Sequence, residues 1–215
     1  MLDASCVMVA SLGGLMNNRE NIRLVKRKIN VVFQRARRNQ AIILTEADLQ
    51  CQIYMELCKS RLNRWNFTCR NEGIKGNPVH AEVSYFDERN SLSYRVDLTI
   101  IDVEELAIVN NPERHIEIHS KEFSFSGRPI IIECKFLRAE RSLSEDVIGP
   151  IREDYEKARA LNARFGNRYE EFRFIEVVFS KHHIAGAGAV LRRVQSDVVG
   201  DARNVETIYK SLDVA

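Results

Sequence analysis

The sequence predicts an α/β fold in which helices flank a central mixed sheet. Two stretches, 94–101 and 129–136, are rich in β-branched and other apolar residues over the length of a strand. Residues 18–38 instead repeat apolar side chains every three or four positions, which is the period of a helix. Between residues 45 and 180, such segments follow one another as helix, three strands, helix and strand. We therefore expect one sheet with helices packed against it.

Length and composition indicate a single domain over residues 1–215. The chain is 45% hydrophobic, which is enough for a substantial core. We divide it into an N-terminal helical extension (1–44), a core (45–180) and a C-terminal extension (181–215). No apolar run of the sequence is long enough to span a bilayer, so no membrane association is expected. The five cysteines form no Cys-x-x-Cys pair, which favours a reducing, cytoplasmic compartment.

Two helices are predicted before the first strand. In residues 18–38 the apolar stripe consists of Ile22, Val25, Ile29, Val32 and Ala36. Residues 45–63 form the second helix, because Thr45 is a suitable N-cap and acidic residues follow it in the first turn.

The remaining elements are mostly strands. We expect core strands at 81–86, 94–101, 129–136 and 172–179, and two short strands at 115–119 and 122–125. Pro150 suits the first turn of a helix, so a helix is predicted from Gly149 to about Arg164, with Gly166 as a stop signal. A final amphipathic helix is predicted at 202–213, with its inward face formed by Val205, Ile208, Tyr209 and Leu212.

Charged side chains interrupt the two most apolar strands. Side chains alternate between the faces of a strand, so Glu133 and Lys135 project to the same side of 129–136. Asp97 interrupts the run 94–101 in the same way. Burying such charges is costly unless they are paired or bind a ligand. If the two strands pair, Asp97 and Glu133 can converge on one Mg²⁺ ion, with Lys135 beside it.

At these residues the chain resembles the PD-(D/E)XK nuclease superfamily. Val96-Asp97 corresponds to the first half of its motif and Glu133-Cys134-Lys135 to the second, although the proline before the aspartate is absent. The stretch between Asp97 and Glu133 is longer than a tight hairpin needs, so an insertion must separate the two strands. The resemblance covers roughly residues 45–180 and implies a restriction-endonuclease-like core with the order α-β-β-β-α-β.

The resemblance implies a Mg²⁺-dependent nuclease, with Mn²⁺ able to replace Mg²⁺. Asp97, Glu133 and the backbone carbonyl of Cys134 are then the expected metal ligands, and Lys135 the residue that orients water and offsets phosphate charge. The helix before the sheet often supplies a glutamate in this superfamily, and Glu46 is the position expected here, with Glu56 a weaker alternative. Many members act as dimers on both strands of DNA, so a homodimer and a DNA substrate, rather than RNA, are expected.

A basic segment gives the chain a candidate surface for a polyanion. The net charge is only +2, yet residues 19–38 hold eight lysines and arginines against one acid, Glu20. The residues that we expect to contact nucleic acid are Arg23, Lys26, Arg27, Arg35, Arg37 and Arg38. Two other interpretations stay open: a packed helix with a solvated basic face, and a dimer seam along the apolar stripe.

The central residues also have non-catalytic interpretations. Glu133 and Lys135 could neutralise each other as a buried pair, and a nuclease-like fold could bind nucleic acid or a protein without cutting. Trp65 could stack on a base, but a tryptophan near a helix end is more often a packing residue. His115 and His119 lie about 13 Å apart if they share a strand, which is too far for one metal.

Overall fold

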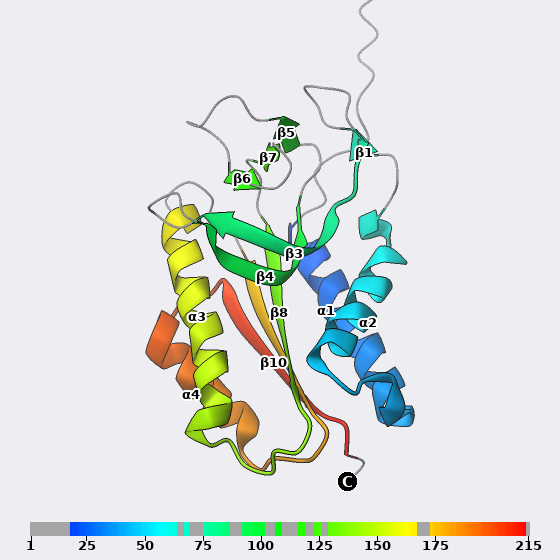
Figure 1. Ribbon diagram of the computed structural model, residues 1–215, viewed down its shortest axis with the longest axis vertical. Helices are drawn as coiled ribbons and strands as arrows, with labels where there is room; N and C mark the ends of the chain where they lie inside the picture. Colours follow the sequence, from blue (N-terminus) through cyan, green and yellow to red (C-terminus); the bar gives the residue numbers. More distant parts are fainter. Residues whose placement is uncertain are drawn as a thin grey trace, which may run out of the picture.

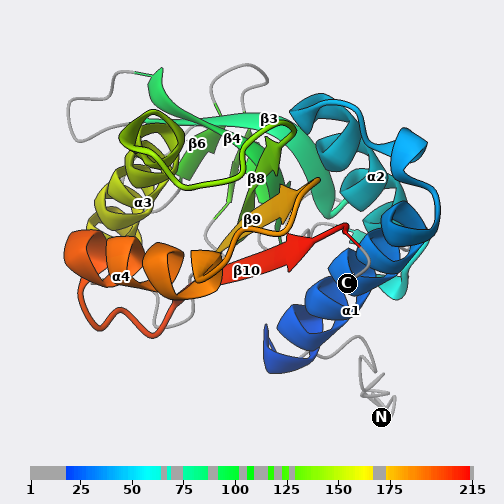
Figure 2. The same cartoon turned by 90° about the horizontal axis from the view of Figure 1, so that it is seen from below.

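A computed structural model describes residues 18–63, 67–68, 75–86, 92–101, 106–108, 116–118, 123–125, 129–166 and 173–213. These residues form an α/β structure in which a five-stranded mixed sheet separates two pairs of helices (Figures 1 and 2). Trp65, His115 and His119 lie outside the described residues, so the structure bears on none of the roles considered for them. None of the described helices is both long and apolar enough to cross a membrane.

The four α-helices are α1 (Asn18–Arg38), α2 (Glu46–Cys58), α3 (Glu145–Gly166) and α4 (Ala187–Val199). Short 3-10 turns follow the first two, η1 at Gln40–Ile42 and η2 at Arg61–Asn63. Thr45 caps α2 as predicted, because its side chain accepts a hydrogen bond from the Asp48 backbone while the Asp48 side chain accepts one from the Thr45 backbone. Helices α1 and α2 cover one face of the sheet, and α3 and α4 cover the other (Figure 2).

The central sheet has the strand order β10-β9-β8-β4-β3. Its strands are β3 (Val79–Phe86), β4 (Leu92–Ile100), β8 (Ile130–Leu137), β9 (Arg173–Ser180) and β10 (Val205–Ser211). Strands β8, β9 and β10 are parallel, whereas β4 is antiparallel to both β3 and β8. Because β8 and β9 are central and covered on both faces, nearly all of their residues are buried, as their continuous apolar sequences predict.

Two minor sheets complete the described structure. Strands β1 (Phe67–Thr68) and β2 (Lys75–Gly76) form an antiparallel pair. Strands β5 (Leu106–Ile108), β7 (Phe123–Phe125) and β6 (Ile116–Ile118) form a three-stranded sheet within the predicted insertion. The sequence predicted β6 and β7 but not β5.

The C-terminal extension differs from its prediction. Residues 205–211 are the parallel edge strand β10 rather than a final helix, and the helix of this region is α4, in the glycine-containing segment before it. The spacing of Val205, Ile208 and Tyr209 suits a helix, but it also places β-branched and aromatic residues beside β9. Residues 205–211 pair with the edge of β9 along seven residues, from Val205 opposite Phe174 to Ser211 opposite Ser180, and so satisfy its backbone hydrogen-bonding groups. The free energy gained from this contact between distant segments outweighs the local preference for a helix.

Helix α3 begins before Pro150 rather than at it. Ser144 ends the preceding loop, and its carbonyl accepts the backbone N–H groups of Val147 (3.0 Å) and Ile148 (2.9 Å). Two acids, Glu145 and Asp146, then occupy the first turn, where they complement the helix dipole. Pro150 lies in the second turn and removes a single backbone hydrogen bond there. The stronger start signal was therefore the serine followed by acids.

The hairpin of β3 and β4 bends sharply at its middle. Val79 and Leu98 pack with α1 and α2, whereas Val83 and Val96 pack with α3 and α4. At the bend, Glu82 has a φ of 54°, a left-handed conformation that is uncommon for a residue with a side chain. Glu82 and Asp97 are the residues that lie between the paired positions Ala81–Leu98 and Val83–Val96 on the two strands. The bend carries the end of the hairpin away from the sheet at the position of Asp97.

Candidate functional site

The candidate site lies where β4 separates from β8. These two strands pair only from Leu98 to Ile100, opposite Ile132 to Ile130. Beyond that point β4 follows the bend described above, while β8 continues beside β9. Asp97 on β4 and Glu133 on β8 are the first residues past the last paired positions. The divergence lets polar side chains gather at the centre of an otherwise apolar sheet.

Backbone N–H groups of the neighbouring strands bind the carboxylates of Asp97 and Glu133. The backbone N–H of Asp97 donates to Glu133 Oε2 at 3.3 Å, and the N–H of Cys134 donates to Asp97 Oδ2 at 2.8 Å. Gln50 of α2 donates to the backbone carbonyl of Asp97 at 2.9 Å and thereby fixes the strand from the other side. The structure therefore brings together the two carboxylates that the sequence singled out.

Lys135 lies between two helices from opposite faces of the sheet. Its Nζ is 2.9 Å from Asp154 Oδ2 of α3 and 3.5 Å from Glu46 Oε1 of α2. Only 18% of its side chain is exposed. Glu46 thus reaches the candidate site, as the resemblance implied. Lys135 does not pair with Glu133, so the expected alternative of a direct Glu133–Lys135 ion pair is wrong.

Three further charged residues complete the group, and the sequence analysis did not find them. Lys157 of α3 places its Nζ 2.5 Å from Glu133 Oε1 and 3.0 Å from Asp154 Oδ1. Asp154 thereby bridges both lysines. Glu176 of β9 lies opposite Glu133 in the register, is fully buried, and has no hydrogen-bond partner on either carboxylate oxygen. We call these seven residues, Glu46, Asp97, Glu133, Lys135, Asp154, Lys157 and Glu176, the carboxylate–lysine cluster.

One sequence signal for these residues was available. Glu176 stands within the apolar run Phe174–Phe179, just as Glu133 stands within its own strand. The same argument about the cost of a buried charge applies to it. Asp154 and Lys157 gave no comparable signal, because charged residues are ordinary on a helix and only the packing of α3 shows which of them face the sheet.

The cluster holds more carboxylates than lysines, and this raises the carboxylate pKa values. Burial, with the added repulsion of Asp154, raises the pKa of Glu133 to about 8. Burial and the same neighbour raise the pKa of Glu176 well above its ordinary range. Burial also raises the pKa values of Asp97 and Glu46, although Lys135 and backbone hydrogen bonds oppose the change.

The pKa values of the two lysines are also raised, but by neighbouring charges and not by burial. Burial by itself lowers the pKa of Lys135, but the carboxylates of Asp154, Glu176 and Glu46 outweigh burial and raise it above the ordinary lysine value. For Lys157, burial likewise lowers the pKa, and Glu133 and Asp154 more than restore it. Both lysines therefore carry a full charge at neutral pH, which makes them electrostatic partners rather than bases.

The protein without bound metal should lose stability as the pH rises from about 5 to about 8. The pKa of Glu133 is about 8 in the folded state, so Glu133 keeps its proton up to that pH, whereas the unfolded chain releases it near the ordinary glutamate pKa of 4.5. The folded state thus binds more protons in this window, and stability falls as pH rises. Thermal denaturation followed by circular dichroism in EDTA measures this slope. Glu133→Gln should flatten it; parallel curves for the two proteins would contradict the assigned shift.

The donor set fits a hard divalent cation. The carboxylates of the cluster outnumber its lysines, and carboxylate oxygens are the ligands that Mg²⁺ prefers. Both oxygens of Glu176 lack a hydrogen-bond partner. Among the residues that the structure describes, no three His, Cys, Asp or Glu side chains are grouped as a ready-made metal site. Mg²⁺ commonly takes only one or two carboxylates and completes its shell with water and substrate phosphate, so Asp97 and Glu133 suffice as its protein side-chain ligands.

The predicted nucleic-acid contacts of α1 divide into two groups. Arg23, Arg27, Arg37 and Arg38 are exposed. Lys26 instead pairs with Glu206 of β10 at 2.5 Å, and Arg35 pairs with Glu56 of α2 at 2.5 Å. Lys26 and Arg35 therefore already serve to attach α1 to its neighbours.

Glu56, the alternative to Glu46, lies outside the candidate site. It is buried between α1 and α2, where its carboxylate contacts Arg35, Lys28 and Lys59. Its role is to join the two helices, so Glu46 is the glutamate of α2 that meets the cluster.

Comparisons with known proteins give no relative. No family model, curated protein or solved structure matches this chain. A function for the protein therefore rests on the residues and geometry described above.

Proposed function

We propose that the protein is a Mg²⁺-dependent nuclease that hydrolyses phosphodiester bonds, with DNA as the favoured substrate and endonucleolytic cleavage as the favoured mode. The observation that carries this proposal is the gathering of Asp97, Glu133 and Lys135 at the point where β4 leaves β8. Two carboxylates and a lysine buried among apolar strands are costly to the fold, and such a cost is expected where a charged ligand compensates for it.

Asp97 and Glu133, with the backbone carbonyl of Cys134, would hold the cation. When bound, Mg²⁺ or Mn²⁺ supplies Lewis-acid polarisation of a phosphate oxygen and lowers the pKa of a coordinated water. Asp97 is held for this role by the Cys134 N–H, and Glu133 by the Asp97 N–H. Glu46 borders the same space, and its carboxylate is about half exposed, so it can accept a hydrogen bond from an entering water.

Lys135 would stabilise negative charge on the substrate. Its raised pKa supports a permanent ammonium that donates hydrogen bonds to a non-bridging phosphate oxygen or to the attacking water. Asp154 keeps the ammonium in position at 2.9 Å, and it holds Lys157 against Glu133 at the same time. Asp154 thus acts through the lysines, as a positioning residue.

The exposed arginines of α1 would hold the nucleic-acid backbone. Arg23, Arg27, Arg37 and Arg38 are exposed on α1, so their guanidinium groups are open to phosphate contact. A cytoplasmic location is part of the proposal; the described cysteines, Cys51, Cys58 and Cys134, are free thiols, as a reducing compartment favours. A homodimer that cuts both strands also remains a proposal from the motif.

Cleavage in the presence and absence of a divalent cation tests the proposal. Supercoiled plasmid and a labelled single-stranded oligonucleotide should both be offered, with Mg²⁺, with Mn²⁺ and with EDTA. We expect cleavage with either metal and none with EDTA, and Asp97→Asn should lower the rate at least about a hundredfold. Asp201→Asn, which changes an exposed aspartate after α4, serves as the control. Equal rates for wild type and Asp97→Asn on every substrate would refute a nuclease centred on Asp97.

The ion pairing of the cluster supports one alternative, a non-catalytic binding module for nucleic acid or protein. Lys157 already contacts Glu133 at 2.5 Å, and Asp154 already pairs with Lys135 at 2.9 Å. With both lysines engaged in this way, the group would serve only to join α3 to the sheet. Binding of nucleic acid without cleavage under all metal conditions would favour this second function.

A further inference from the structure

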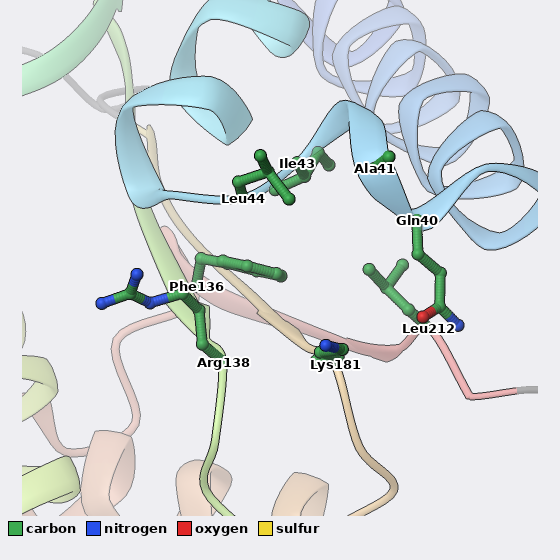
Figure 3. A pocket seen from close by; sticks show the side chains of 8 residues that line it. All are labelled: Gln40, Ala41, Ile43, Leu44, Phe136, Arg138, Lys181 and Leu212. Atoms are coloured by element: carbon green, nitrogen blue, oxygen red, sulfur yellow. The ribbon is translucent and has the colours of Figure 1, made fainter.

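A pocket of about 450 Å³ lies at the carboxyl ends of the parallel strands β8, β9 and β10. Phe136 and Arg138 come from the end of β8, Lys181 follows β9, and Leu212 follows β10. The segment that connects α1 to α2 closes the pocket from the other side (Figure 3). Open α/β sheets commonly bind ligands at this edge of their parallel strands.

One part of the pocket wall is flat and apolar. The ring of Phe136 lies across the space between Leu44 and the ends of the strands (Figure 3). Leu44 is 60% exposed, the largest exposed fraction among the large hydrophobic residues that the structure describes. Ile43 and Leu212 also line the pocket, but both are buried. An aromatic ring beside an exposed leucine suits a planar ligand that can stack.

The charged part of the wall is entirely basic. Arg138 and Lys181 lie on either side of the Phe136 ring (Figure 3), and both are exposed. Among the described residues that line the pocket, none carries a carboxylate. Exposed Arg37 and Arg38 at the end of α1 lead directly into the connecting segment. The ligand that complements this arrangement is a flat apolar group with negative charge on both sides of it.

The pocket adjoins the carboxylate–lysine cluster. Phe136 directly follows Lys135 on β8, and Leu44 precedes Glu46 by two residues. Lys135 and Phe136 nevertheless project to opposite faces of β8: Lys135 Nζ lies 3.5 Å from Glu46 Oε1, whereas Phe136 packs on the side of α1 and α2. Beyond Ile132 no described residue of β4 pairs with β8, so a chain at the cluster can reach the pocket around this edge of β8.

We propose that this pocket binds the base of one unpaired nucleotide next to the phosphodiester that is cut, so that the preferred substrate is single-stranded nucleic acid. The inference rests on the proposed function, which it deepens by naming the substrate class. The base stacks on Phe136 and contacts Leu44, while Arg138 and Lys181 take the phosphates before and after it. In a duplex, neighbouring bases cover both faces of each base, so a duplex must lose a pair before it can fill the pocket.

Binding without cleavage tests the inference independently of catalysis. Fluorescence anisotropy in EDTA should compare a short fluorescein-labelled oligothymidine with a labelled duplex of equal length. Wild type should bind the single strand more tightly. Leu44→Glu should weaken this binding about tenfold, because it places a carboxylate where the base and its phosphates lie, and should leave duplex binding unchanged. Lys181→Glu should have the same selective effect.

Met55→Glu and Arg193→Glu are the matched controls. Met55 is an exposed hydrophobic residue of α2, 45% exposed, and Arg193 is an exposed cation of α4, on the other side of the sheet. Neither should change single-strand binding. The inference is overturned if Leu44→Glu behaves like Met55→Glu, or if duplex and single strand weaken equally. The binding assay contains no metal, so neither outcome depends on whether the protein cleaves nucleic acid. Likewise, a protein that fails to cleave in the assay described above can still be tested for the binding preference.

Discussion

Lys135→Ala should lower phosphodiester cleavage by about a thousandfold while the protein keeps its fold. The ammonium group of Lys135 lies near the carboxylates of Asp97, Glu46 and Asp154. These carboxylates keep the Lys135 side chain protonated. After truncation of Lys135 to alanine, Lys157 cannot supply the missing charge, because it is bound to Glu133. Initial rates on a labelled oligonucleotide with saturating Mg²⁺, together with anisotropy in EDTA, separate lost chemistry from lost binding.

Lys28→Ala provides the matched control for this variant. Lys28 is similarly buried, with 22% of its side chain exposed, and pairs with Glu56 between α1 and α2. Its removal should cost stability of the same order without a change in cleavage rate. Lys135→Arg, which keeps the charge, should retain part of the activity. If Lys135→Ala cuts as fast as Lys28→Ala, the catalytic proposal fails and the cluster is a structural network.

Glu176→Met should make the protein more stable. The carboxyl of Glu176 is fully buried and has no hydrogen-bond partner, so no hydrogen bond compensates for its desolvation in the folded state. Methionine has a similar length and no polar atom, and replacement of buried charged groups by apolar ones is often stabilising. We expect a gain of about 2 kcal/mol. For a chain of this size that corresponds to about 4–8 °C in Tm by calorimetry.

The gain should increase with pH. The pKa of Glu176 is raised in the folded state, so the destabilisation caused by its buried carboxyl is least below the ordinary glutamate pKa and grows as the pH rises toward the raised value.

Glu56→Met is the opposite control. Glu56 is also buried, at 4% exposure, but it pairs with Arg35 at 2.5 Å, and its loss should lower Tm. A lower Tm for Glu176→Met at all pH values would show that the carboxyl has partners in solution. A higher Tm accompanied by weaker metal-dependent cleavage would indicate that Glu176 is kept for function.

Local pattern predicted most of the elements because their periodicity is strong. The runs around Asp97 and Glu133 became β4 and β8, and the stripe of α1 packs on the sheet along the predicted face. The capping residue of α2 was read correctly from Thr45 and the acids after it. At Pro150 one local signal was outweighed by another, the serine and acids before it, whereas in residues 205–211 a local helical pattern was outweighed by pairing with the distant strand β9.

Spacing alone places Glu133 and Lys135 on one face of their strand, since side chains alternate along a strand. The sequence also shows that Asp97, Glu133 and Lys135 are charged residues within apolar strands. The groups that they meet follow from tertiary packing: Lys157 against Glu133, Asp154 between the two lysines, and Glu176 opposite Glu133. These contacts depend on the register of β9 beside β8 and on the rotation of α3 over the sheet. Neither is encoded in a local period, because both are set by how separate segments pack together.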